Sequence, residues 1–182
     1  NNEQIRTTIS LNNVPVKIGG AHAGISVGPD GATHQALEDI ALMRVQPNMT
    51  VLVPCDAIEA RKATLADAFY DGPVYIRLGR EKTAIFTAED APFEIGKANI
   101  LREGKDATVI GCGSLLYNAL IAAEELSKDK IDVEVINCHT IKPLDAETIL
   151  SSVKKTGAIV SIEEHQIMGG LGSAVAEMLA QN

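Results

Sequence analysis

The sequence predicts an α/β protein of two units, each a small parallel or mixed sheet covered by helices. Short apolar runs alternate with stretches of helical periodicity, which is typical of strand–helix–strand repeats with right-handed crossovers. The alternation breaks once, and the chain of 182 residues is 46% hydrophobic, enough for a sizeable core. We therefore expect one unit in residues 1–82, a linker at residues 83–95 and a second unit in residues 96–182.

The first unit begins with a strand that runs into a glycine-rich loop. Its expected strands are the apolar runs at residues 16–20, 50–54 and 74–78. Thr33 is the expected N-cap of a helix that Pro47 closes. Asp56, followed three residues later by Glu59, has the form of a capping box and predicts a helix to about residue 70.

The second unit repeats this alternation. Its expected strands are residues 107–112, 132–136 and 158–162. Its expected helices are residues 114–127, a helix that Asp145 caps and that ends near residue 156, and a final helix that follows residues 169–172.

The composition excludes several classes of protein. Aromatic residues make up 3% of the chain, so the core is expected to be aliphatic, and a formal net charge of −8 argues against nucleic acid or an anionic membrane as a partner. Three widely spaced cysteines (Cys55, Cys112 and Cys138) predict neither disulfides nor a zinc site, and we interpret them as small core hydrophobes. The polar start resembles no signal peptide and no apolar run is long enough to span a membrane, so we expect a cytoplasmic protein.

The glycine-rich loop, residues 19–31, is the strongest candidate for a functional site. It lies where a strand ends, and ligands of open parallel sheets bind at the carboxyl ends of strands. His22, Asp30 and His34 lie in or beside it. Histidine and aspartate side chains can donate, accept and exchange protons with hydroxyl groups. We therefore expect function here rather than ordinary turn chemistry.

Residues 22–44 resemble the signature of transketolases, in the pattern H-x7-D-G-x-T-H-Q followed by E-x2-A-x2-R. Residues 162–172, with I-E-E-H and G-G-L-G, resemble the C-terminal section of split, two-subunit transketolases. The resemblance covers the whole chain. It implies a partial pyrimidine-binding domain followed by a transketolase C-terminal domain. It also implies transfer of a two-carbon ketol unit from a ketose phosphate to an aldose phosphate with thiamine diphosphate.

The resemblance implies a role for four side chains. His22 would lie near the cofactor's thiazolium ring and the reacting carbons, and His34 would hydrogen-bond the hydroxyls at the ketol end. Asp30 would accept a hydrogen bond from a substrate hydroxyl. Arg80 matches the arginine that binds the sugar phosphate, which suits a planar guanidinium at a strand end. Arg77 is the competing choice, but its position inside the strand favours Arg80.

Other features are interpreted as structural. Residues 111–114 follow a strand and open a helix but lack the third glycine of a dinucleotide loop, so we expect a tight turn. Residues 169–172 could hold an anion, although close packing of a helix is the preferred interpretation. His139 and His165 stand alone in the sequence, and a structural role is favoured for both.

The resemblance also implies that parts of the site lie elsewhere. Nothing resembles the metal-binding G-D-G…N motif of the family, so we expect a partner, the N-terminal transketolase subunit, to hold the diphosphate and its Mg²⁺ or Ca²⁺. The family's cofactor-activating glutamate would precede the equivalent of residues 4–6, and the C-terminal end is short. We therefore expect a chain that is partial at both ends, inactive alone, and part of a homodimer or heterotetramer.

Two alternatives stay open. The first is another thiamine-diphosphate enzyme, either deoxyxylulose-phosphate synthase or the β subunit of a 2-oxo acid dehydrogenase. The second is a non-catalytic assembly subunit that has kept the fold.

Overall fold

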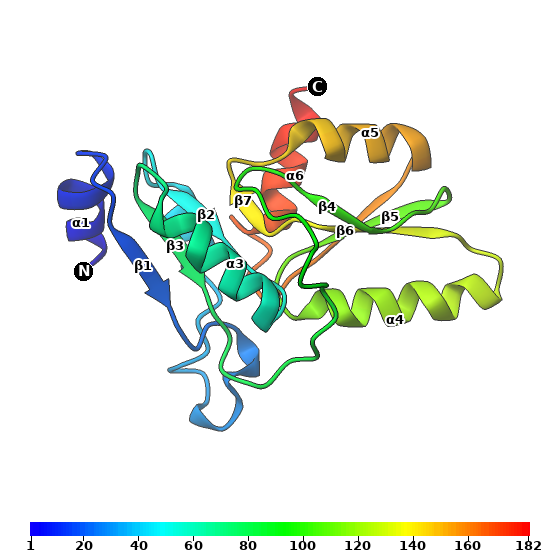
Figure 1. The fold of residues 1–182 in the computed structure, drawn as a ribbon, viewed down its shortest axis with the longest axis horizontal. Helices are drawn as coiled ribbons and strands as arrows, with labels where there is room; N and C mark the ends of the chain where they lie inside the picture. Colours follow the sequence, from blue (N-terminus) through cyan, green and yellow to red (C-terminus); the bar gives the residue numbers. More distant parts are fainter.

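The computed structural model describes residues 1–182 and contains two four-stranded sheets (Figure 1). The first sheet has the strand order β1-β3-β2-β7 and the second β4-β6-β5-β8. The strands are β1 (Lys17–Gly20), β2 (Thr50–Leu52), β3 (Val74–Arg77), β4 (Asn99–Arg102), β5 (Ala107–Gly111), β6 (Val133–Asn137), β7 (Thr140–Lys142) and β8 (Ile159–Ile162). The α-helices are α1 (Asn2–Gln4), α2 (Asp39–Arg44), α3 (Ala57–Ala68), α4 (Leu115–Lys128), α5 (Ala146–Thr156) and α6 (Leu171–Ala180); the π-helix η1 (Ile5–Ser10) and the 3₁₀ segment η2 (Ile25–Asp30) complete the set.

The predicted α/β fold is confirmed, and both sheets are mixed rather than purely parallel. β1, β2 and β3 are parallel, as are β5, β6 and β8. The two strands that the sequence did not reveal, β4 and β7, pair antiparallel with β6 and β2. Both are short and include polar residues, so neither stands out as an apolar run. β7 lies in the second half of the chain but completes the first sheet.

The helix after the glycine-rich loop is shorter than expected. α2 begins at Asp39, after the N-cap residue Glu38, so the prediction that Thr33 caps this helix is wrong. Thr33 lies in a turn, where its hydroxyl is 2.9 Å from His34 Nδ1. The reason is tertiary: the Ala36 carbonyl accepts hydrogen bonds from Gly24 N and from Arg77 Nη2, which keeps it out of a helical ladder.

The predicted cap of α3 is confirmed, and the capping side chain also binds the backbone of residues 86 and 87. Asp56 Oδ1 accepts from the backbone N–H of Glu59 at 2.9 Å, while Glu59 Oε2 accepts from Cys55 N rather than from Asp56 N. Asp56 Oδ2 accepts from the backbone N–H groups of Phe86 and Thr87. Burial would raise the pKa of Asp56, but these hydrogen bonds outweigh it and lower that pKa.

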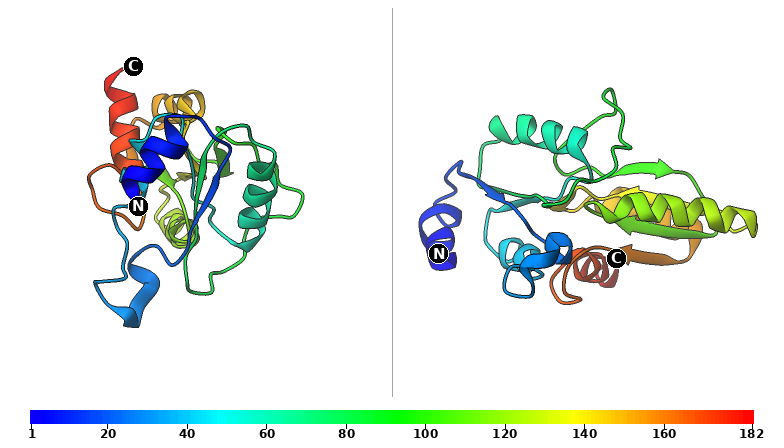
Figure 2. Two further views of the ribbon diagram at one scale, coloured as in Figure 1. Left: turned by 90° about the vertical axis from the view of Figure 1, so that its left-hand side faces the viewer. Right: turned by 90° about the horizontal axis from the view of Figure 1, so that it is seen from below.

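The two units share one hydrophobic core. A cluster of 16 buried residues contains Ile40 and Val51 from the first unit together with Ile110, Ile149 and Leu171 from the second. α2 and α3 cover opposite faces of the first sheet, and α4 and α5 lie on opposite sides of the second (Figures 1 and 2). None of the helices combines the length and the apolar character that crossing a membrane requires.

His139 is a core residue, as expected. It is fully buried, its ring stacks on Phe93 with centroids 4.2 Å apart, and its Nδ1 lies 3.0 Å from the Thr140 hydroxyl. Its Nε2 has no hydrogen-bond partner. Burial lowers the pKa of His139 to about 4, because the charged ring would be desolvated.

This burial predicts an acid-sensitive fold. Between pH 6.5 and 4 the unfolded chain binds a proton at His139 that the folded chain does not, so stability should fall as the pH falls through this window. The contribution should reach about 3 kcal/mol. Urea unfolding of the wild type and His139→Asn at several pH values tests this, with a flatter pH dependence expected for the variant. Equal slopes for the two proteins would contradict it.

Candidate active site

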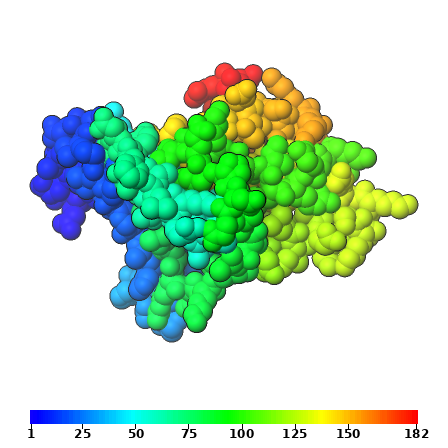
Figure 3. Space-filling model, viewed as in Figure 1, coloured from blue at the N-terminus to red at the C-terminus, as the bar shows by residue number.

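The candidate site lies where β1 and β3 end. The two strands are parallel, and their pairing continues past Gly20: Leu78 N donates to Gly20 O at 2.8 Å, and Ala23 N donates to Leu78 O at 3.1 Å. The two loops that follow therefore leave the sheet side by side. In the space-filling view they form a lobe that projects from the lower edge of the molecule (Figure 3).

The glycine-rich segment is a closed loop with a defined neck. Ala23 and Ala36 form an isolated parallel bridge, and Gly24 N donates to Ala36 O at 2.9 Å. We call residues 23–36 the site loop. His22 lies immediately before the neck and His34 immediately inside its other end, so one backbone contact brings both histidines to the same region.

Both histidines are exposed. His22 has φ 59°, a left-handed conformation that is uncommon for residues other than glycine and that collects at functional sites. His34 is held only at Nδ1, next to the Thr33 hydroxyl. An exposed histidine with a free ring nitrogen can accept a hydrogen bond from a bound hydroxyl compound or donate one to it.

The structure brings together two of the side chains expected to contact substrate, Asp30 and Arg80. Arg80 Nη1 lies 2.8 Å from Asp30 Oδ2 and also donates to Val27 O at 3.1 Å. The exposed fractions of the Arg80 and Asp30 side chains are 35% and 43%. Nη2 and Nε of Arg80 have no protein partner, so the guanidinium can still bind an oxyanion while it is attached to the site loop.

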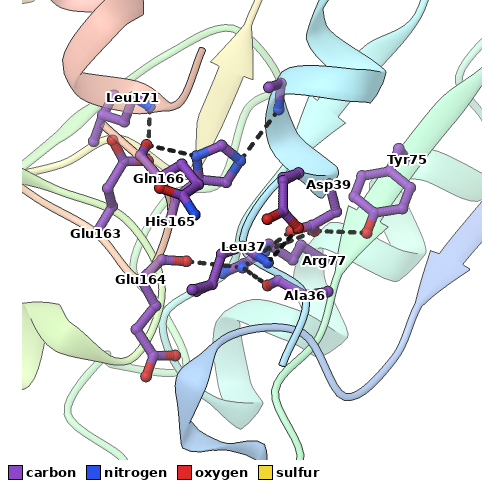
Figure 4. A network of polar contacts seen from close by, with 12 residues as sticks. Ala36, Leu37, Asp39, Tyr75, Arg77, Glu163, Glu164, His165, Gln166 and Leu171 are labelled. Atoms are coloured by element: carbon purple, nitrogen blue, oxygen red, sulfur yellow. Dashed lines mark hydrogen bonds and ion pairs between the residues drawn. The ribbon is translucent and has the colours of Figure 1, made fainter. Parts of the chain in front are cut away.

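Arg77, the competing arginine, is a buried anchor. It is 7% exposed, and its Nε and Nη2 donate to the two Asp39 oxygens at 2.8 and 3.1 Å. Nη2 also donates to the carbonyls of Ala36 and Glu164, and Tyr75 OH donates to Asp39 (Figure 4). Burial opposes the charged form, but hydrogen bonds and attraction to Asp39 outweigh it and raise the pKa of Arg77.

A cavity of about 680 Å³ adjoins the neck of the site loop, between the two units. Ala23 and Ser26 of the loop contribute to its wall, as does Glu164, but His22, Asp30, His34 and Arg80 do not. The turn at residues 112–114 lines it too; Gly113 has φ 67°, which confirms the tight-turn interpretation of this segment. The cavity and the predicted site residues are therefore neighbours rather than one pocket.

Two buried polar residues, Glu59 and Asn137, contact Cys55 in the wall of this cavity. Glu59 Oε1 accepts from Asn137 Nδ2, and burial raises the pKa of Glu59.

The three cysteines are buried and free, as interpreted from the sequence. Burial raises the pKa of each thiol, that of Cys138 to about 12, so none is a reactive thiolate at neutral pH.

The glycines before α6 bind an internal carboxylate. Glu163 accepts hydrogen bonds from the backbone N–H groups of Leu171 and Gly172 at 2.7 and 2.9 Å. A Cβ atom at Gly170 would lie 2.4 Å from Glu163 Oε2. This segment therefore binds an anion that belongs to the protein itself. It also packs closely, as preferred from the sequence, because a Cβ atom at Gly169 would lie 2.5 Å from Ala41 Cβ.

Sequence reasoning missed the polar network that joins the units. Arg77, which binds Asp39, donates to the carbonyl of Glu164 from the second unit (Figure 4). Ala41 N of the first unit donates to His165 Nε2 of the second. The only local signal is a charged pair, Glu163-Glu164, directly after an apolar strand. Such a pair suggests helix capping or a surface turn as readily as it suggests a contact with a distant loop.

Comparisons with known proteins identify both units. The family described as "transketolase, pyrimidine binding domain" matches residues 1–84, and the family "transketolase, C-terminal domain" matches residues 96–182. The chain is 43% identical over 180 residues to a 6-deoxy-6-sulfo-D-fructose transketolase subunit of Clostridium sp. (strain MSTE9), covering 99% of the chain and 56% of that protein. It is 39% identical over 181 residues to one subunit of the apulose-4-phosphate transketolase of Phocaeicola vulgatus, covering 99% and 58%.

A solved structure shows the same arrangement. A split-gene transketolase, described as an inactive β4 tetramer, superimposes with a TM-score of 0.92 at 44% identity, covering 99% of this chain and 58% of that one. The chain thus spans a little over half the length of the relatives it matches. Because two adjacent family domains together account for nearly all of its residues, the chain belongs to the transketolase family and corresponds to the C-terminal section of split transketolases.

Proposed function

We propose that this chain supplies the substrate-facing part of a transketolase that moves a two-carbon ketol unit from a ketose phosphate to an aldose phosphate. The observation that carries the proposal is the gathering of two exposed histidines and the Asp30–Arg80 pair around one loop at the carboxyl ends of β1 and β3. Membership in the transketolase family supports the reaction class. Sugar phosphates offer the hydroxyls and the oxyanion that these side chains recognise.

Each side chain has a proposed task. His22 and His34 orient the substrate hydroxyls and exchange protons with them at their free ring nitrogens. Asp30 accepts a hydrogen bond from one hydroxyl and so favours one stereochemistry. Arg80 binds the phosphate through the donors that the protein leaves free. His22 additionally faces the cofactor.

The cofactor of the proposed reaction is thiamine diphosphate. The residues present fit the side of it that faces the substrate, because His22 and His34 are exposed and keep unpaired ring nitrogens. When bound, thiamine diphosphate acts as the electron sink for cleavage of the carbon–carbon bond beside the ketose carbonyl. The only carboxylate in the site loop, Asp30, is engaged by Arg80, so we propose that a carboxylate outside this chain's site loop activates the aminopyrimidine.

We propose that a partner with a pyrophosphate-binding domain completes the site. In this chain no group of three or more His, Cys, Asp or Glu side chains converges on one point, and Mg²⁺ or Ca²⁺ needs several oxygen ligands. The diphosphate and its metal would then be held by the N-terminal subunit, in a homodimer or heterotetramer. Residues 1–82 would supply part of the pyrimidine-binding domain, residues 83–95 the linker and residues 96–182 the C-terminal domain.

The substrate is expected to carry an anionic group at the end far from the carbonyl. The relatives named for 6-deoxy-6-sulfo-D-fructose and for apulose 4-phosphate act on a sulfonate and a phosphate. Both are oxyanions that a guanidinium binds in the same geometry. Arg80 is the residue of the site loop region suited to either group.

Replacing Arg80 by alanine tests the proposal in the complex reconstituted with an N-terminal subunit, thiamine diphosphate and Mg²⁺. The KM for xylulose 5-phosphate should rise about 10- to 100-fold, the value of a charged hydrogen-bonded contact, with kcat within a few-fold. Arg61→Ala is the matched control, since Arg61 makes an exposed ion pair with Glu89 away from the site loop. An unchanged KM in Arg80→Ala contradicts the assigned role, and decarboxylation of pyruvate without ketol transfer would favour a different thiamine enzyme.

A further inference from the structure

One short segment of the second unit contacts the first unit beside the site loop. We call residues 164–169 the crossing segment, because it leads from β8 over the first unit to α6. Gln166 N donates to Leu37 O at 2.8 Å, and Ala41 N donates to His165 Nε2 at 3.3 Å. Arg77 and Arg44 donate to the carbonyls of Glu164 and Gly169, so each end of the crossing segment is tied to the first unit. Figure 4 shows the Glu164 carbonyl directed at Arg77 across this junction, while the Glu164 side chain points away from Arg77.

The Glu164 side chain reaches further, into the site loop itself. Its Oε1 accepts from Ser26 N at 3.2 Å and its Oε2 accepts from Ser26 Oγ at 3.0 Å. Ser26 lies in η2, between His22 and Asp30 in sequence. Both donors of Ser26 are thus bound by one carboxylate from a residue that is 138 positions away.

The neck of the loop is shaped to admit this carboxylate. A Cβ atom at Gly24 would lie 2.4 Å from Glu164 Oε2, and Gly24 has φ 94°, which side chains rarely adopt. Glycine at this position therefore serves both the left-handed turn and the close approach of Glu164. The other loop glycines, Gly28 and Gly31, have open space around them and show no comparable contact.

We propose that Glu164 is a positioning residue for the active site. It holds the site loop through Ser26, so that His22, Asp30 and His34 keep the arrangement that the substrate requires. The C-terminal domain acts in this way on a site to which it contributes none of the predicted catalytic side chains. The catalytic half of this inference rests on the proposed function, whereas the structural half does not.

Hydrogen–deuterium exchange on the full chain tests the structural half without any activity. Glu164→Gln keeps the shape of the side chain but removes its charge, and a charge-assisted hydrogen bond is about twice as strong as a neutral one. Amides within residues 24–36 should exchange about tenfold faster in Glu164→Gln and in Ser26→Ala, while Ser26→Thr, which keeps both donors, should stay near the wild type.

Asp145→Asn is the matched control. Asp145 also accepts hydrogen bonds from backbone N–H groups and from one hydroxyl, that of Thr148, but it caps α5 and does not touch the loop. Its replacement should speed exchange in α5 and leave residues 24–36 unchanged. Equal loop exchange in Glu164→Gln and the wild type, or the same acceleration in Asp145→Asn, overturns the proposal.

Kinetics in the assembled complex test the catalytic half. Glu164→Gln and Ser26→Ala should each lower kcat about tenfold, the double variant should lose little more than either single one, and Ser26→Thr should restore the rate. Asp145→Asn should keep the wild-type kcat. Faster loop exchange without a fall in kcat overturns the positioning role. If the wild-type complex transfers no ketol unit, the proposed function fails instead, and the exchange result still decides whether Glu164 holds the loop.

Discussion

Replacing Arg77 by alanine should lower the free energy of unfolding by about 3–5 kcal/mol. The guanidinium is 7% exposed and binds both oxygens of Asp39, which is itself largely buried. Without it, a carboxylate stays inside the protein with only the Tyr75 hydroxyl as a partner, the Glu164 carbonyl loses its donor, and the Ala36 carbonyl keeps only Gly24 N. Urea unfolding of the purified chain, followed by circular dichroism, measures the change.

Two further variants separate this effect from general damage. The double variant Arg77→Ala, Asp39→Ala should be less destabilised than the sum of the two single variants, since it removes the unpaired charge together with its partner. Arg61→Ala removes an exposed ion pair and should change stability by less than about 0.5 kcal/mol. A loss for Arg77→Ala as small as that of Arg61→Ala would mean that the network at the junction does not hold the units together.

Replacing His34 by alanine should lower kcat for ketol transfer by about 100-fold or more in the assembled complex. Proton exchange through a positioned side chain contributes about 10² to 10⁴ in rate, and His34 lies exposed at the neck of the site loop. The stability of the chain should change little, because the side chain makes a single contact, with the adjacent Thr33. Steady-state kinetics with a ketose phosphate donor and an aldose phosphate acceptor measure the effect.

Thr33→Ala serves as the control for this change. It removes the one side-chain partner of His34 but leaves the imidazole in place, so kcat should fall only a few-fold. Wild-type turnover in His34→Ala, with the Arg80→Ala variant equally active, would favour an assembly role for this chain over a catalytic one.

Much of this molecule follows from local sequence signals. Apolar runs correctly predict six of the eight strands to within a few residues, because strands covered on both faces of a sheet are mostly apolar, even though β3 and β6 each include a buried charged residue. Asp56 and Asp145 correctly predict the starts of α3 and α5, since a cap acts on backbone N–H groups only a turn away. The predicted cap at Thr33 is wrong because capping rules consider only nearby residues. The nearby Ala36 carbonyl is instead hydrogen-bonded by residues distant in the chain.

Only the tertiary structure distinguishes the roles of the two arginines. Arg77 and Arg80 differ by three positions and carry the same group, and the sequence offers only a preference for the strand end. The structure separates them because Asp39 and the Glu164 carbonyl, the latter 87 positions away, surround Arg77, whereas Arg80 meets Asp30 at the surface. Charge and burial at a given residue depend on which distant groups share its space.

The sequence alone therefore predicts the order of the elements, the glycine-rich loop and the family of the chain. Each of these depends on residue spacing within a few tens of residues. Only the tertiary structure determines the shared core, the pairing of β7 with the first sheet and the hydrogen bonds between Glu164 and Ser26. Periodicity and capping describe a chain's contacts with its own neighbours in sequence. They carry no information on which face, edge or carboxylate will be brought against a loop by the rest of the protein.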